Sequence, residues 1–169
     1  MEKELKKIAP KFVGKEKLRP ALSYIWVNNN NVAYVTNAHA LLKYRLSEPL
    51  ESGWYNVKGE KIKEDYYPSF DNPFKTFEGI ADKKNITINF VDLPKTFDNP
   101  FICVNNDNIP KIHIEFKTAK AIADIIGKKE YNGIFAHEND NNYLVQKLLL
   151  LQTEKFDVLW AVAYDQKPY

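Results

Sequence analysis

The residues of this sequence that could do chemistry begin with a histidine in the stretch VAYVTNAHALL, residues 32 to 42. His39 follows Thr36 by three positions, and a histidine beside a hydroxyl could act in acid–base catalysis or hold a metal ion. A metal site would need further ligands at short spacing, but His113 and His137 are far away in the sequence. We therefore interpret His39 as a hydrogen-bonded loop histidine and predict no metal site.

Motifs of known catalytic chemistry do not occur in the sequence. It contains no GxxxxGK[ST], GxGxxG, GxSxG or HExxH, and six glycines leave little scope for a loop that cradles phosphate. The acids are scattered, and residues 137 to 140 (HEND) read as an exposed turn rather than an acid–base pair. A small hydrolase or nuclease would need clustered acids. We therefore predict a protein that is not an enzyme, with no catalytic residues and no cofactor.

Cysteine content and hydropathy exclude two further classes. The single cysteine, Cys103, cannot form an internal disulfide, and its apolar neighbours PFICV predict a buried, inert thiol. The N-terminus is charged from its second residue, which does not fit a signal peptide. The longest strongly apolar run, residues 148 to 151, is far too short to cross a bilayer. We therefore expect a cytoplasmic protein with no membrane partner.

Lysines are the other side chains that could bind a ligand, and they are concentrated at one end. The net charge of the whole chain is only +2, but residues 1 to 20 carry seven Lys or Arg against three Glu. Such a cluster could contact the phosphates of duplex DNA. Exposed lysines on any soluble domain would give the same pattern, so both interpretations stay open.

Two predicted helices position these lysines. Residues 2 to 13 form an amphipathic pattern whose apolar face is Leu5, Ile8, Ala9 and Phe12, although Pro10 should kink or break the helix. Residues 118 to 127 form the second, with Thr118 as N-cap, Gly127 as the stop, and a buried face of Ile122, Ile125 and Ile126. The lysines expected on the two outward faces are Lys3, Lys6, Lys7, Lys11, Lys117, Lys120 and Lys128.

Most of the remaining chain reads as strands. They are expected at residues 22–27, 32–36, 40–46, 54–57, 85–90, 101–104, 111–116, 133–137, 143–151 and 156–164. Four asparagines, 28 to 31, tolerate positive φ and predict a tight hairpin turn. Residues 58 to 100 look irregular outside their one short strand, with aromatic side chains that pin the segment to the core. The two halves of the chain share one predicted order of elements: a helix, Gly-Lys, a strand, an Asn-rich turn and a second strand. The sequence identity between the halves is too low to prove a duplication.

Residues 18 to 46, LRPALSYIWVNNNNVAYVTNAHALLKYRL, resemble the bacterial sliding clamp, the β subunit of DNA polymerase III. In that family an RP-L element leads into strand, turn and strand, followed by a T-D-G-H-R-L loop. The matching positions here are Thr36, His39 and Leu41, and the departures are Asn37, Ala38 and Ala40. YPSFDNPF, residues 67 to 74, is similar to the phrase that ends clamp domains, and VLWAVAY to the family's closing strand.

The resemblance implies a fold and two surfaces. Clamp domains consist of two αβ repeats with sheets outside and helices lining a basic hole, where phosphates are held without sequence readout. Partner proteins insert short peptides into an apolar pocket, which in this chain would involve Thr36, His39, Leu41 and Val162. Ala40 replaces the family's arginine, so conventional clamp-binding peptides would lose a polar contact.

The sequence therefore predicts an α+β protein with DNA-clamp-like architecture, built from two αβ repeats with antiparallel sheets and two helices on one face. Residues 1–169 would form a single domain, with halves at about 1–58 and 109–169 and an irregular connection at about 59–108. The expected function is that of a non-catalytic clamp-like protein, for instance of a phage or mobile element, that meets duplex DNA or replication proteins and forms a homo-oligomer. The alternative is a stand-alone interaction module or modulator that keeps the fold without binding DNA.

Overall fold

The computed structural model describes residues 1–14, 19–64, 68–90, 101–106, 109–127, 129–137 and 147–164. Lys128, the acidic cluster that follows His137, the first part of the expected strand 143–151 and the side chain of Cys103 lie outside the described part of the chain.

The helices are α1 (Lys3–Phe12), α2 (Asp71–Gly79) and α3 (Phe116–Ile126), and a 3-10 turn spans Pro20–Leu22. The strands are β1 (Ile25–Val27), β2 (Val32–Thr36), β3 (Ala40–Arg45), β4 (Gly53–Tyr55), β5 (Lys61–Ile62), β6 (Lys83–Asn89), β7 (Phe101–Asn106), β8 (Ile109–Glu115), β9 (Glu130–His137), β10 (Lys147–Gln152), β11 (Phe156–Ala161) and β12 (Ala163–Tyr164). The predicted α+β class is confirmed.

The main sheet has nine antiparallel strands in the order β5-β4-β1-β2-β3-β11-β10-β9-β6. β3 and β11 pair at its centre, with Leu41 opposite Leu159, and so join the N-terminal strands to the C-terminal strands. On either side of this pair the order β4-β1-β2-β3 is mirrored by β6-β9-β10-β11. A second sheet of three strands has the order β12-β8-β7. This arrangement is the two-repeat architecture that the sequence predicts.

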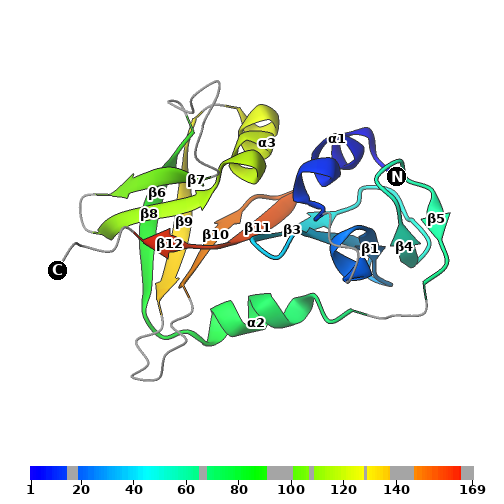
Figure 1. Cartoon of the computed structure of the whole chain (residues 1–169), viewed down its shortest axis with the longest axis horizontal. Coiled ribbons are helices and arrows are strands. Elements are labelled where there is room, and N and C mark those ends of the chain that lie inside the picture. Colours follow the sequence, from blue (N-terminus) through cyan, green and yellow to red (C-terminus); the bar gives the residue numbers. More distant parts are fainter. Residues whose placement is uncertain are drawn as a thin grey trace.

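Helices α1 and α3 lie side by side on one face of the nine-stranded sheet, and α2 covers part of the other face (Figure 1). The larger apolar core fills the space between the sheet and α1 and α3. A smaller apolar cluster lies under α2 and includes Tyr34, Leu41 and Leu159. Because α2 and the helix pair cover opposite faces, alternate residues of the central strands face different partners.

Helix α1 follows the prediction closely. Leu5, Ile8, Ala9 and Phe12 are all buried, as the amphipathic pattern requires. Pro10 lies inside the helix, which continues only two residues beyond it. Proline lacks the N–H that would bond to the carbonyl oxygen one turn back, so the helix loses one hydrogen bond at this position, and it ends within a turn of the proline.

Helix α3 begins earlier than the sequence predicts. Its N-cap is Glu115 and not Thr118, because β8 runs directly into the helix. The Thr118 hydroxyl instead donates a hydrogen bond to the carbonyl oxygen of Glu115 (3.1 Å) and accepts one from Nε1 of Trp160 (2.9 Å). Gly127 ends the helix as predicted, with a φ of 90° and an N–H donated to Ala123.

The segment predicted as irregular, residues 58 to 100, contains helix α2. Phe74 and Phe77 are three positions apart and both are buried against the sheet. Asp71 and Pro73 fall in its first turn, where both residue types are well tolerated. The expectation that aromatic side chains pin this segment to the core is confirmed, but they do so from a regular helix.

Candidate functional site

The outward faces of α1 and α3 carry the lysines that the sequence selected. Lys3, Lys6, Lys7 and Lys11 on α1 are exposed, and so is Lys117 on α3. The side chain of Lys120 is 43% exposed. Helices α1 and α3 pack against each other, so the two helices that carry these six lysines are neighbours. We call this set the lysine face.

Two acidic residues at the start of α1 are bound to a buried tyrosine. Glu2 and Glu4 turn toward the buried Tyr44, whose hydroxyl lies 3.0 Å from Oε2 of Glu2 and 2.9 Å from Oε1 of Glu4. Lys155 adds an ion pair of 2.8 Å to Glu2. Burial raises the pKa of Tyr44, and the hydrogen bonds to both carboxylates raise it further, so its single proton stays shared between them.

Asp124 is the exposed acid of α3 and pairs with Lys120 at 3.5 Å. Both side chains of this pair are more than two fifths exposed, so the pair is screened by water and contributes little to stability. Lys6 leans toward Gly59 in the turn between β4 and β5. The lysine face is therefore predominantly positive, with Lys7 and Lys11 as exposed members at its α1 side.

The loop that follows β2 is held by its own side chains. The Thr36 hydroxyl donates to the carbonyl oxygen of Ala40 (2.8 Å), and Oδ1 of Asn37 accepts the N–H groups of His39 (3.0 Å) and Ala40 (2.9 Å). Ala38 has a φ of 73°, in the left-handed region that costs a residue with a Cβ about 1–2 kcal/mol. The asparagine and threonine bonds close the turn without the glycine that the clamp family has there.

The four residues expected to line a partner site are not equivalent. His39 is exposed, and its carbonyl oxygen accepts the N–H of Ala161 (2.9 Å), which places it next to half-buried Val162 at one end of the central strands. Thr36 is buried and its hydroxyl is used within the turn. Leu41 is 6% exposed and belongs to the apolar cluster under α2. Of the four, His39 and Val162 are therefore the two that the structure leaves accessible.

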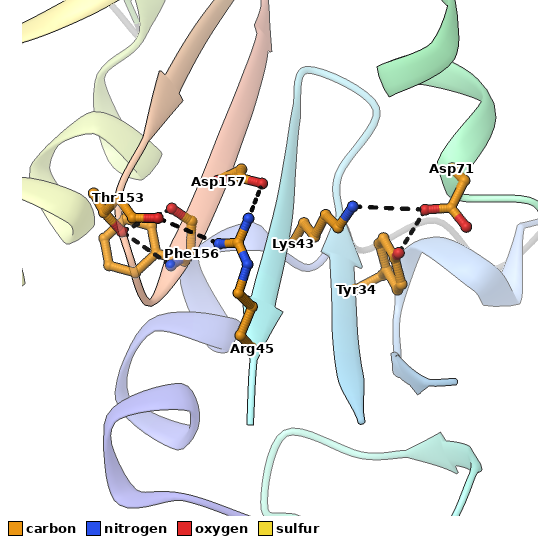
Figure 2. Close-up of polar contacts among 7 residues, drawn as sticks. All are labelled: Tyr34, Lys43, Arg45, Asp71, Thr153, Phe156 and Asp157. Carbon is orange, nitrogen blue, oxygen red and sulfur yellow. Dashed lines mark hydrogen bonds and ion pairs between the residues drawn. The ribbon is translucent and has the colours of Figure 1, made fainter. Parts of the chain in front are cut away.

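A polar cluster on the opposite face of the sheet was missed from the sequence (Figure 2). Tyr34 donates a hydrogen bond of 2.6 Å to Oδ1 of Asp71, and Nζ of Lys43 lies 3.9 Å from the same oxygen. Burial raises the pKa of Tyr34, and the Asp71 carboxylate raises it further. Further along β3, Arg45 holds the buried Asp157 at 2.6 Å. Helix α2 supplies Asp71 to this cluster, and the three-residue spacing of Phe74 and Phe77 is the sequence pattern that could have predicted this helix.

A groove runs between α2 and the sheet beside this cluster, with a volume of about 410 Å³. Its apolar lining includes Phe74, Phe77, Ile134 and Leu150. The polar residues that line it are Lys43, Arg45, Glu78, Lys83, Gln152 and Asp157.

The described residues offer neither a metal site nor a membrane-spanning helix. Within the described ranges of the chain, no three His, Cys, Asp or Glu side chains are grouped so that they could hold a metal ion. No helix in the same ranges is long and apolar enough to span a membrane.

Comparison with known proteins agrees with the architecture. No protein-family model and no curated protein matches the chain. The chain is similar to the crystal structure of a "Putative DNA polymerase III beta subunit" from Eubacterium rectale, with a TM-score of 0.54 and 11% sequence identity. The fold is clamp-like. The match covers 98% of this chain but 62% of the other, so this chain spans less than two thirds of that protein.

Proposed function

We propose that this protein is a non-catalytic, clamp-like protein that associates with duplex DNA through the lysine face. The observation that carries the proposal is that α1 and α3 lie together on one face and expose six lysines, while Glu2 and Glu4 of α1 turn toward Tyr44. Lysines spaced along two helices suit contacts to phosphates, which give affinity without sequence readout. The similarity in fold to the protein from Eubacterium rectale also supports the proposal of a clamp-like protein.

A protein of one clamp-like domain would need other copies to surround a duplex. The nine-stranded sheet ends in β5 on one side and β6 on the other, and such edges can pair with another chain. A homo-oligomer that closes through these edges would bring several lysine faces around one duplex. Accessible His39 and Val162 then form a second surface, at the end of the central strands, for a replication protein.

The test is light scattering of the protein with and without a short DNA duplex, at low and at moderate salt. Ring-sized oligomers that retain DNA less well as salt rises are the expected result. Replacing Lys7 and Lys11 together by glutamine should lower the slope of log affinity against log salt by about 2, because each phosphate contact contributes about 0.9. The matched control replaces two exposed lysines outside α1 and α3, Lys63 and Lys75, and should leave the slope unchanged.

The second candidate function is an interaction module that does not bind DNA. It is favoured by the net charge of only +2 and by the loop after β2, which departs from the clamp family's sequence at Asn37, Ala38 and Ala40. In that case the protein stays a monomer or dimer with the same mass whether or not DNA is present. Loss of DNA binding in the Lys63 and Lys75 control to the same degree as in the Lys7 and Lys11 variant would also contradict the proposed lysine face.

A further inference from the structure

The loop between β2 and β3 borders both helices that carry the lysine face. Gly14 lies just beyond the end of α1, and a Cβ built on it would lie 3.7 Å from Cα of Asn37. On its other side, Asn37 donates a hydrogen bond of 2.8 Å from Nδ2 to Oε2 of Glu115, the N-cap residue of α3. One asparagine therefore lies against the segment that ends α1 and holds the start of α3, seventy-eight residues away in the sequence.

The side chain of Asn37 is fixed in the orientation that this contact needs. Its Oδ1 accepts the N–H groups of His39 (3.0 Å) and Ala40 (2.9 Å), so the amide cannot rotate without opening the turn. An amide has an acceptor and a donor on one planar group, and the donor is thereby aimed at Glu115. Ala38 keeps a left-handed φ of 73° in this loop, a conformation that persists only where the surrounding bonds over-determine the backbone.

Glu115 lies where strand β8 passes into helix α3 with no residue between them. Its side chain makes no capping hydrogen bond to the helix and binds Asn37 instead. Its carbonyl oxygen accepts the hydroxyl of Thr118 (3.1 Å), which accepts Nε1 of Trp160 in turn (2.9 Å). Trp160 therefore holds the start of α3 to the sheet, and Asn37 holds it to the loop that borders α1.

The position of this helix start decides where an exposed lysine stands. Lys117 follows Glu115 by two residues, so it lies in the first turn of α3 and moves with the N-cap. Lysines on two separate helices can neutralise phosphates of one duplex together only where the helices keep a fixed relation, because ordering them on binding would reduce the affinity.

We propose that Asn37 and Glu115 are a positioning pair for the lysine face. Their hydrogen bond sets the start of α3 against the loop that borders α1, and so aligns Lys117 with the lysines of α1 on one duplex. The pair acts through Lys117 and does not itself touch DNA. This inference rests on the proposed association with duplex DNA, so its test includes a measurement made without DNA.

Two substitutions of Glu115 remove the same charge and differ in the hydrogen bond. Glu115→Gln keeps an oxygen that accepts from Asn37, whereas Glu115→Ala does not. Electrostatics alone would make both variants bind a duplex more tightly, because a carboxylate near Lys117 is gone. We expect tighter binding only for Glu115→Gln. For Glu115→Ala the slope of log affinity against log salt should fall by about 1 and the affinity by about fivefold at physiological salt, because one phosphate contact is lost.

An exchange of the two functional groups controls for charge. Asn37→Asp keeps the acceptor for His39 and Ala40 but sets a carboxylate against Glu115, so it should lower the salt slope as Glu115→Ala does. Combining Asn37→Asp with Glu115→Gln restores the wild-type net charge and lets the amide at position 115 donate to the carboxylate at 37, so the slope should recover. Asn85→Asp adds one negative charge at an exposed position of β6 and should leave the slope unchanged.

A distance measured without DNA separates the positioning of α3 from DNA binding. Spin labels at Lys3→Cys and Lys117→Cys, in a Cys103→Ser background, report the distance between the starts of α1 and α3 by pulsed EPR. Asn37→Asp should shift or broaden the distance distribution, and adding Glu115→Gln should restore it. A substitution that only reduces the folded fraction changes neither the salt slope nor the distance within folded molecules, so these readouts exclude a purely structural role.

The outcomes distinguish the pair from the function it serves. Unchanged slopes and distances in Asn37→Asp and Glu115→Ala would overturn the positioning pair. Recovery of the distance without recovery of the slope in the double variant would overturn it too, because Asn37 would then contact DNA directly. A wild-type protein that does not bind the duplex would refute the proposed function, and the distances alone would then decide whether the pair positions α3. If Asn37→Asp does not fold, the comparison of Glu115→Ala with Glu115→Gln decides by the same readouts.

Discussion

The hydrogen bond between Trp160 and Thr118 should make a measurable contribution to the stability of the fold. Both side chains are fully buried, and the Nε1–H of Trp160 on β11 reaches the Thr118 hydroxyl on α3 at 2.9 Å. Thr118→Val keeps the shape and β-branching of the side chain but removes the acceptor, which leaves the indole N–H without its partner. The expected cost is about 2 kcal/mol. For a chain of this length that corresponds to a fall in Tm of about 4–8 °C.

A second substitution separates the hydrogen bond from packing. Thr118→Ser keeps the hydroxyl and removes one buried methyl group, which should cost about 1 kcal/mol. Urea denaturation of both variants, followed by Trp fluorescence and circular dichroism, gives the two free energies of unfolding on one scale. We expect the valine variant to be the less stable of the two. The reverse order would refute the reasoning, because it would mean that packing and not the hydrogen bond holds α3 to β11.

Two further predictions concern the edges of the larger core. Burial alone would raise the pKa of Glu2, but hydrogen bonds from Lys155, the Ser47 N–H and Tyr44 together lower it below 4.5. The stability that these hydrogen bonds add is present above pH 4.5 and is lost as the pH falls through the lowered pKa of Glu2. Glu2→Gln should therefore flatten the dependence of the urea midpoint on pH in that acid range. A Cβ at Gly133 would lie 2.7 Å from Cδ1 of the buried Ile88. Gly133→Ala should therefore lower the free energy of unfolding by about 1–3 kcal/mol in the same urea assay. An unchanged urea midpoint would show that the core accommodates the added methyl group.

Local patterns predicted the parts of the fold that depend on neighbours in the sequence. The apolar spacing of residues 2 to 13 was sufficient for α1, because an amphipathic helix buries every residue of one face. The asparagine turn also formed as predicted, and Asn31 has a φ of 60°. By contrast, the N-cap of α3 could not be read from Thr118, since β8 runs directly into the helix and the Thr118 hydroxyl instead accepts a hydrogen bond from Trp160, forty-two residues away.

The strands were harder to interpret where both faces of the sheet are covered. In β11 the first five residues are all buried, so the alternation that marks a half-exposed strand is absent. Asp157 therefore sits in an apolar run with nothing nearby in the sequence to show its partner, because Arg45 reaches it from β3. The groove could be recognised only after the pairing of β3 with β11 and the position of α2 were known.

The same pairing explains how one short sheet can present two unrelated surfaces. On β3, Tyr44 points toward the side of α1 and binds its glutamates, while the adjacent Lys43 and Arg45 point toward α2 and the groove. On β11, Asp157 faces the groove, whereas Trp160, three positions further, faces α3. Successive residues of a strand alternate between faces, so a shift of one residue in the register would exchange the two sets. The buried contacts of Tyr44 and Trp160 therefore fix the register that brings the groove's charged residues together.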